Sequence, residues 1–236
     1  MTYRALQWNT KRSKQGLEVL LEEAEFDFLL IQEPWINLTT GSTYCPRSSK
    51  YYLIHKPNGK AAIFVNKRYP IGQWDFEAAE NWCTVWLLGY GPQDLGLELW
   101  SVYNPPDNDT QVLQVLLERP NRAGSIVLTG DFNLHHPQWD YYNRYDENAE
   151  TLLQLALQWD LSLRTPRGAV TRKPQGRQRG RPSTIDHFWA SIDLPATYYG
   201  LEERWKSDHY PQVLEFRCLQ AHGQGQQSHG QPQGWN

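Results

Sequence analysis

The sequence predicts a single domain of the α/β class, and three observations support this prediction. The 236 residues are a usual length for one such domain and are enough to bury a sizeable core. The first part of the chain has the pattern strand, helix, strand. Strand-like apolar runs then recur as far as Cys218, with only two further helical patterns between them.

The first three elements follow from the spacing of apolar residues. The residues from Tyr3 to Trp8 alternate, which indicates a strand. Apolar residues at helical spacing from Leu17 to Ala24 predict a helix. The segment FDFLLIQ, residues 26–32, is an apolar run that suits a buried strand.

The remaining elements are predicted in the same way. Strand-like runs before residue 105 lie at 51–54, 61–67, 83–90 and 97–104. A helix is expected over 108–118, a very apolar strand over 125–130 and a second helix over 147–159. Short strand candidates surround residues 169–171, and the last strands are expected at 183–191, 196–205 and 212–218.

Composition predicts where the domain ends and where the protein acts. From Gln220 onward the chain is rich in Gln, Gly and His, so we expect a folded domain over residues 1–218 and a disordered tail over 219–236. The chain has neither a long apolar stretch for a bilayer nor a signal-peptide pattern, which predicts an intracellular protein. Cys45, Cys83 and Cys218 form no CxxC pair and are expected to be reduced thiols.

Charge is distributed unevenly along the chain. The net charge of −3 gives no overall attraction to a polyanion, so nucleic-acid binding requires a local basic patch. Between Asp160 and Asp186 there is no acidic residue, and seven basic residues lie there among Gly and Pro: Arg164, Arg167, Arg172, Lys173, Arg177, Arg179 and Arg181. Such a segment can contact several phosphates, or it can simply be a solvated basic loop.

Acidic and amide residues follow several of the apolar runs. They are Asn9, Glu33, Asp131 with Asn133, and Asp186, and a further group, Ser207-Asp208-His209, precedes the last strand. Each alone is more often a cap or a turn residue. If the strands share one sheet or a stacked pair, however, these side chains converge. Hard oxygen ligands of this kind suit Mg²⁺, or Mn²⁺ in its place, and phosphoryl transfer.

The ordered set of motifs LQWN, IQEPW, SVYNPP, GDFNLHHPQWD, STIDHFWAS and SDH resembles the endonuclease/exonuclease/phosphatase superfamily. Within it, the chain is most similar to the endonuclease domain of non-LTR (LINE-type) retrotransposons, and the HHPQW extension is the most specific feature. The resemblance covers residues 3–217. It implies a four-layer α/β sandwich, in which two mostly antiparallel sheets pack face to face and helices flank them.

The resemblance also implies a metal site and a water-activating pair. Glu33 would be the principal ligand of Mg²⁺, with Asn9 nearby and Asp208 completing the metal and water network. Asp131 would orient or deprotonate the attacking water. Asn133 would hydrogen-bond the scissile phosphate and help to position that water.

The other implied catalytic residues act on the phosphate. Tyr103 would donate a proton or a hydrogen bond, and His209, oriented by Asp186, would stabilise the pentavalent transition state. Abasic-site enzymes of the superfamily have an acidic residue two positions after the first-strand Asn, whereas this chain has Lys11. A lysine there would repel a second cation, which favours a single main metal ion.

For the basic segment, the resemblance implies a hairpin that enters the minor groove of duplex DNA. Its tip would run from Thr171 to Arg181. The residues predicted to contact DNA are Thr171, Arg172, Lys173, Arg177, Arg179 and Arg181.

The function that follows is nicking of duplex DNA to leave a 3′-hydroxyl and a 5′-phosphate. In a retroelement that hydroxyl would prime reverse transcription, so a reverse transcriptase acting in trans is a second implied partner, and nuclear action is expected. Two alternatives stay open. One is a general or abasic-site repair nuclease, which Lys11 and the HHPQW extension oppose; the other is an inactive relic that only binds nucleic acid.

Overall fold

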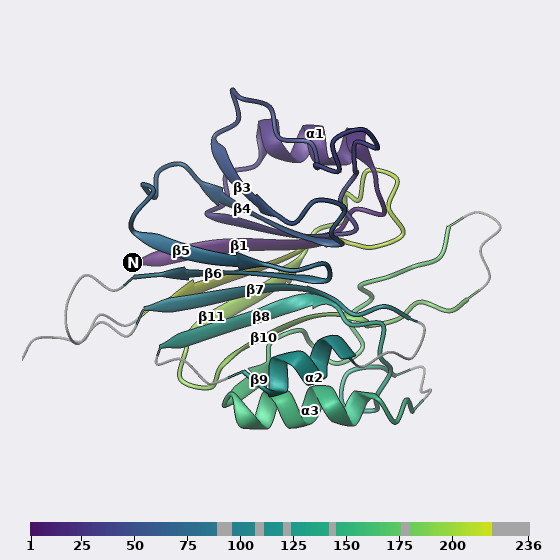
Figure 1. The fold of residues 1–236 in the computed structure, drawn as a ribbon. Helices are drawn as coiled ribbons and strands as arrows, with labels where there is room; N and C mark the ends of the chain where they lie inside the picture. Colours follow the sequence, from purple (N-terminus) through teal and green to yellow (C-terminus); the bar gives the residue numbers. More distant parts are fainter. Residues whose placement is uncertain (89–95, 107–110, 120–123, 142–144, 176–179, 219–236) are drawn as a thin grey trace, which may run out of the picture.

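The computed structural model describes residues 1–218 apart from 89–95, 107–110, 120–123, 142–144 and 176–179. Two six-stranded sheets pack face to face, and helices cover their outer faces (Figure 1). The predicted class, a sandwich of two sheets with flanking helices, is therefore confirmed. The disorder predicted for residues 219–236 lies outside the described residues.

The first sheet contains the amino-terminal and carboxy-terminal strands side by side. Its order is β11 (Ala196–Gly200), β12 (Gln212–Arg217), β1 (Thr2–Asn9), β2 (Phe28–Gln32), β4 (Ala61–Asn66) and β3 (Tyr51–His55). β1 and β2 are parallel, and α1 (Lys14–Glu23) is the crossover between them. Ser13 begins that helix, because its hydroxyl accepts a hydrogen bond from the backbone N–H of Gly16.

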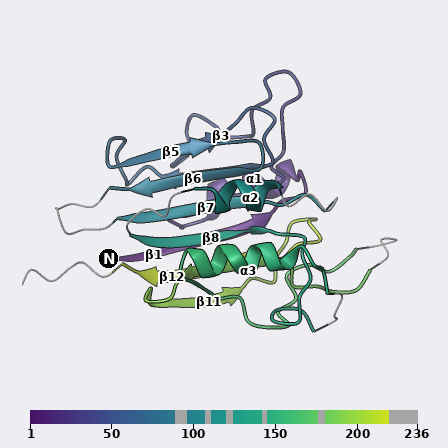
Figure 2. The same cartoon turned by 60° about the horizontal axis from the view of Figure 1, so that its bottom comes forward.

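The second sheet has the same kind of arrangement. Its order is β5 (Trp74–Ala78), β6 (Trp82–Leu87), β7 (Leu97–Tyr103), β8 (Ser125–Asp131), β10 (Asp186–Ser191) and β9 (Leu161–Leu163). β7 and β8 are parallel, and the connection between them contains α2 (Gln111–Leu117). Figure 2 shows α2 and α3 (Ala149–Gln158) lying over the outer face of this sheet.

Three apolar clusters fill the spaces between these layers, because side chains alternate along each strand. In β2, Phe28 and Leu30 point between the two sheets, whereas Leu29 and Ile31 point toward α1. A third cluster joins the second sheet to α2 and α3. Full burial of each large apolar side chain contributes roughly 1.5–3 kcal/mol, so the strands are held firmly in register.

Most predicted elements are present, with four differences. β5 was not predicted, because WDFEA is a half-exposed edge strand without a clear apolar pattern. A strand was expected beside residues 169–171, but the strand β9 lies at 161–163. Near residues 169–171 the structure has isolated β-bridges, which join Arg172 to Ser183 and to His209. The strand expected over 196–205 ends at Gly200. α2 begins at Gln111, and residues 108–110 of the predicted helix lie outside the described residues.

Two expectations about the whole chain can be compared with the structure. The described part contains no helix that is long and apolar enough to cross a membrane. Among the described residues no disulfide bond joins Cys45, Cys83 or Cys218.

Candidate active site

The site forms where the ends of strands from both sheets meet. Asn9 is the last residue of β1, Glu33 directly follows β2, and Asp131 is the last residue of β8. β10 runs antiparallel to β8, so its first residue, Asp186, pairs with Asp131. Tyr103 ends β7 and pairs with Asp131 on the other side. Strand pairing within each sheet, together with the packing of the two sheets, therefore brings these five residues to one place.

A glycine allows β7 and β8 to approach closely just before Asp131. A Cβ atom on Gly130 would lie 1.8 Å from the carbonyl oxygen of Val102 in β7. Any side chain at this position would push the two strands apart and displace Asp131. The glycine of the GDFN motif is therefore required by packing.

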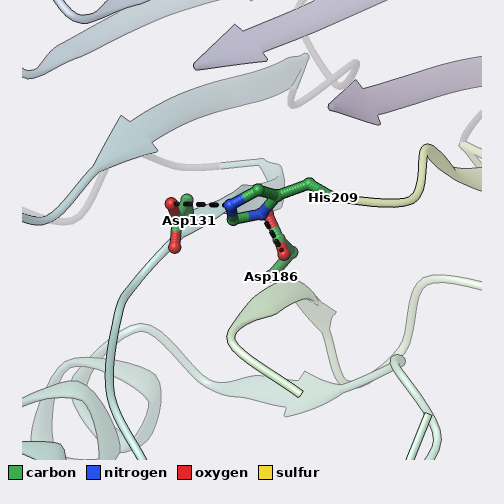
Figure 3. Close-up of side chains that lie close together, drawn as sticks. All are labelled: Asp131, Asp186 and His209. Carbon is green, nitrogen blue, oxygen red and sulfur yellow. Dashed lines mark hydrogen bonds and ion pairs between the residues drawn. The ribbon is translucent and has the colours of Figure 1, made fainter. Parts of the chain in front are cut away.

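His209 and Asp186 form a buried pair at the centre of the site. Nδ1 of His209 lies 2.8 Å from Oδ2 and 3.1 Å from Oδ1 of Asp186, and Nε2 points toward Oδ2 of Asp131 at 4.0 Å (Figure 3). Both residues are at most 4% exposed. Trp8 helps to hold the backbone of His209 in place, because its indole N–H donates to the carbonyl oxygen of His209.

The electrostatics of this pair favour a protonated imidazole. Burial alone lowers the pKa of His209, but the negative charges of Asp186 and Asp131 outweigh burial and raise that pKa to about 9. Burial raises the pKa of Asp131, and repulsion from Asp186 adds to the effect. A cation therefore sits beside a carboxylate that can accept a proton near neutral pH.

Asn9 connects the side chains of Glu33 and Asp131. Its Nδ2 donates to Oε1 of Glu33 at 3.0 Å and to Oδ2 of Asp131 at 2.8 Å. Its Oδ1 accepts from the backbone N–H of Lys11. Glu33 is half-buried and has a backbone φ of +42°, in the left-handed region. The unusual conformation turns the chain directly after the buried strand β2.

The described residues contain one group of three close metal-binding side chains, formed by Asp131, Asp186 and His209. We do not assign the metal to this group, because a histidine must be neutral to bind a metal and the carboxylates of Asp186, Asp131 and Asp208 all favour the protonated ring of His209. The carboxylate oxygen atoms of Glu33 are harder ligands and suit Mg²⁺ better, whereas Asn9 turns its Nδ2, and not its oxygen, toward Glu33.

Asp208 faces Nε2 of His209, as Asp131 does, and is held by two cations. Its Oδ2 lies 2.8 Å from Nζ of Lys11 and 3.0 Å from Nε of Arg172. Burial favours the neutral acid, but the hydrogen bond from Lys11 and the charges of His209 and Arg172 lower the pKa of Asp208. Its Oδ1 is buried, has no hydrogen-bond partner among the described residues and lies 3.8 Å from Nε2 of His209.

Tyr103 and Asn133 complete the predicted set. Tyr103 is half-buried, and burial together with the negative charges of Glu33 and Asp131 raises its pKa, so the hydroxyl remains a donor. Asn133 has a φ of +50°, and its backbone N–H donates to Oδ1 of Asp131. Its Nδ2 donates to the carbonyl oxygen of Asn104 at 2.9 Å, which leaves one amide hydrogen for another acceptor.

A buried amide network below the site was not predicted from the sequence. Nε2 of Gln7 donates to Oδ1 of Asp186 at 3.0 Å and to Oε1 of Gln32 at 2.7 Å, and Gln212 donates to Oε1 of Gln7. All three glutamines are almost fully buried between the sheets. The feature of the sequence that indicates this network is a glutamine in each of three apolar strands. Buried amides require hydrogen-bond partners.

The HHPQW extension has a structural place in this chain. Trp139 is fully buried, and its indole N–H donates to the carbonyl oxygen of Leu134. His135 pairs with Asp140 at 2.7 Å, and the ring of His136 packs on Trp139. The extension therefore anchors the loop after β8 to the core beside α3.

The basic segment is attached at its base to the loop that carries Asp208 and His209. Thr171 is 1% exposed, and its hydroxyl accepts from the backbone N–H of Asp186, so it lies inside the protein and not at a hairpin tip. The backbone N–H of Lys173 donates to the carbonyl oxygen of Asp208. Arg181 is exposed, and the ribbon extends away from the sheets on both sides of residues 176–179 (Figure 1). Arg177 and Arg179 lie outside the described residues.

Comparison with known proteins agrees with this architecture. Residues 97–213 match the family described as endonuclease-reverse transcriptase. Among curated proteins there is no significant match. A solved structure, the endonuclease domain of TRAS1, a telomere-specific non-LTR retrotransposon, is similar with a TM-score of 0.65 at 20% identity, over 92% of this chain and 100% of that one.

Two further solved structures share the fold. The AP endonuclease LMAP from Leishmania major has a TM-score of 0.68 at 13% identity, over 92% of this chain and 88% of that one. The 3′-5′ exonuclease NExo from Neisseria meningitidis has a TM-score of 0.58 at 17% identity, over 90% of this chain and 99% of that one. The chain therefore shares the fold of the endonuclease/exonuclease/phosphatase proteins, and residues 97–213 match the endonuclease-reverse transcriptase family.

Proposed function

We propose that this nuclease is a Mg²⁺-dependent endonuclease that nicks duplex DNA and leaves a 3′-hydroxyl and a 5′-phosphate, as in retrotransposon target-site cleavage. The observation that carries the proposal is the buried His209–Asp186 pair facing Asp131, at the same strand edge as Glu33 and Asn9. A cation, a proton acceptor and hard oxygen ligands are thereby brought to one place.

The oxygen chemistry at this edge fits a divalent metal. Glu33 would hold it, and Nδ2 of Asn9 would orient that carboxylate. Oδ1 of Asp208, which has no hydrogen-bond partner among the described residues, is a further acceptor near Nε2 of His209. A bound Mg²⁺ neutralises charge that develops on the phosphate and lowers the pKa of water. Because Oδ2 of Asp208 is already held by Lys11 and Arg172, we propose Glu33 as the principal ligand.

The protein's own residues divide the chemistry of phosphodiester cleavage. Asp131 accepts the proton of the attacking water, and Asn133 holds that carboxylate through its backbone N–H and offers an amide hydrogen to the phosphate. His209, kept protonated by Asp186, stabilises the negative charge of the pentavalent transition state. Tyr103, whose hydroxyl stays protonated, donates to the phosphate or the leaving oxygen.

The substrate proposal rests on the basic segment next to this site. Its exposed cations extend from a base that contacts Asp208 and His209, so a duplex bound there lies beside the catalytic residues. We propose that Lys173, Arg177, Arg179 and Arg181 contact the DNA backbone or minor groove. A reverse transcriptase that extends the new 3′-hydroxyl is the proposed partner, and action on chromosomal DNA is proposed to take place in the nucleus.

Conversion of supercoiled plasmid to nicked circle tests this proposal. We expect nicking with Mg²⁺ or Mn²⁺, none with EDTA, and none with His209→Ala, with circular dichroism checking that the variant is folded. DNA ligase should reseal the nicked circle directly, because it requires a 3′-hydroxyl and a 5′-phosphate. Nicks that ligase cannot seal would contradict the proposed product.

Two comparisons separate the alternatives. Cleavage of an abasic duplex much faster than of the intact duplex would favour a repair nuclease. Tight binding of DNA without metal-dependent cleavage by the folded wild-type protein would favour an inactive nucleic-acid-binding protein.

A further inference from the structure

A cavity of about 620 Å³ opens beside Glu33, within the size range of sites that hold small organic ligands. It is bounded by the β1–α1 loop, the segment after β2 and the β3–β4 turn. The lining residues that matter here are Arg12, Glu33, Trp35, Leu38, Asn58 and Lys60. Among the nine described lining residues Glu33 is the single acid, and the mechanism above uses only Glu33.

Two cations are fixed to the backbone of Glu33. The backbone N–H of Arg12 donates to the carbonyl oxygen of Glu33 at 2.8 Å, and the backbone N–H of Glu33 donates to the carbonyl oxygen of Lys60 at 2.8 Å. Neither Arg12 nor Lys60 has an ion pair with any other described residue, whereas Lys11 and Lys14 nearby both do. Their charges are therefore available for an anion next to the proposed metal ligand.

The cavity also presents an apolar surface. The half-buried indole of Trp35 is supported by the ammonium group of Lys14, which lies 5.3 Å from its ring centroid and pairs with Glu18 at 3.0 Å. Leu38 is 97% exposed at the same cavity. An aromatic ring and an exposed aliphatic side chain beside two cations suit a flat ring carried on a phosphate.

From this combination we infer that the cavity binds one nucleotide of the cleaved strand, adjacent to the scissile phosphate. The base stacks on Trp35 against Leu38, the amide of Asn58 faces its polar edge, and Arg12 and Lys60 bind the neighbouring phosphate. The inference rests on the proposed function, because it is Glu33 that links this cavity to the cleavage site. It adds a position at which the DNA strand is held and its sequence preference is influenced.

Photo-crosslinking tests the position directly. Duplex oligonucleotides with 5-iododeoxyuridine at single positions are irradiated with His209→Ala protein and Mg²⁺, so that the DNA stays uncut, and cross-linked peptides are identified by mass spectrometry. We expect Trp35 to be modified from one or two neighbouring positions beside the nick. Cross-links from all positions that leave Trp35 unmodified would overturn the inference.

Variants provide a second measurement in the active protein. Trp35→Ala should raise KM for nicking about tenfold. The double variant Arg12→Gln with Lys60→Gln should lower the slope of log Kd against the logarithm of the salt concentration by about one unit. The control is Lys67→Gln, because Lys60 and Lys67 flank opposite ends of β4 and Lys67 is exposed outside the cavity.

The outcomes distinguish this inference from the proposed function. If the wild-type protein nicks DNA and the cavity variants behave like Lys67→Gln, the inference about the cavity is contradicted and the proposed function is not. Absence of nicking by the wild-type protein would contradict the proposed function and with it the position beside a scissile phosphate, and a Trp35 cross-link would then show only that the cavity holds a DNA nucleotide.

Discussion

Nδ1 of His209 lies 2.8 Å from Oδ2 of Asp186, although Asp186 belongs to the second sheet and His209 lies in the loop that leads into the first. Asp186 begins β10 in the second sheet, whereas His209 precedes β12 in the first. The proposed transition-state cation therefore exists only when the two sheets are packed together. Gln7 of β1 reinforces the same junction through its hydrogen bond to Asp186.

Asp186→Asn should reduce kcat for nicking by about 10²–10⁴, the range seen when the carboxylate that orients a catalytic histidine is lost. The charge of Asp186 raises the pKa of His209 toward about 9, so activity that needs the cation should persist below pH 9 and fall above it. In the variant this alkaline limb should move to lower pH. A pH profile of kcat/KM checks this, and an unmoved limb would argue against His209 as the required cation.

Lys11→Met should lower kcat at least tenfold, because Asp208 would lose the ammonium group 2.8 Å from its Oδ2, and its buried charge would be compensated only by Arg172 and the more distant ring of His209. Stability should also fall, by about 1–3 kcal/mol, as expected when a buried charged group loses a hydrogen-bond partner. Lys11→Arg is the matched control and should retain most activity. Urea unfolding with nicking kinetics measures both effects; equal kcat values for Lys11→Met and wild type would contradict the role.

Arg181→Gln and Arg172→Gln should differ although both remove a cation from the basic segment. Arg181 is exposed, so its loss should weaken DNA binding and lower the salt slope by about one unit without changing kcat at saturating DNA. Nε of Arg172 binds Asp208, so its loss should also reduce kcat. Nicking at several salt concentrations separates the two effects, and parallel behaviour of the two variants would refute the distinction.

His187 should make the protein lose stability in weak acid. It is fully buried among Phe132, Trp139 and Trp189, and burial lowers its pKa from 6.5 to about 4. The neutral ring stabilises the fold fully above pH 6.5, and that contribution, roughly 3 kcal/mol at most, is lost as the pH falls toward 4. His187→Phe should flatten this part of the unfolding free energy against pH, measured by urea titration; an unchanged slope would exclude His187 as the cause.

The local pattern of the sequence was sufficient for most strands and for the catalytic candidates. Apolar periodicity located β1, β2, β4, β7 and β8, and the polar residues at their ends were identified because a chain that leaves a buried sheet presents them at its edge. The half-exposed strand β5 and the three-residue strand β9 were missed. Both depend on pairing with a neighbour and carry little apolar signal of their own.

The details of the site could be predicted less completely. The motifs identified Asn9, Glu33 and Asp131 as candidates, but nothing local indicated that Asn9 donates to both carboxylates. Lys11 was expected to repel a second cation, and the structure shows its actual contact, the carboxylate of Asp208. Thr171 was expected to face DNA, and the structure shows it hydrogen-bonded to the backbone of Asp186.

By itself the sequence determined which residue types stand at strand ends, because strand periodicity and chain direction act over a few residues. Only the tertiary structure decided which of those residues touch. Gln7 meets Gln212, 205 positions away, and Asn9 meets Asp131, 122 positions away. These contacts depend on the pairing and packing of two sheets, and the burial that this packing creates lowers or raises the pKa values on which the proposed chemistry depends.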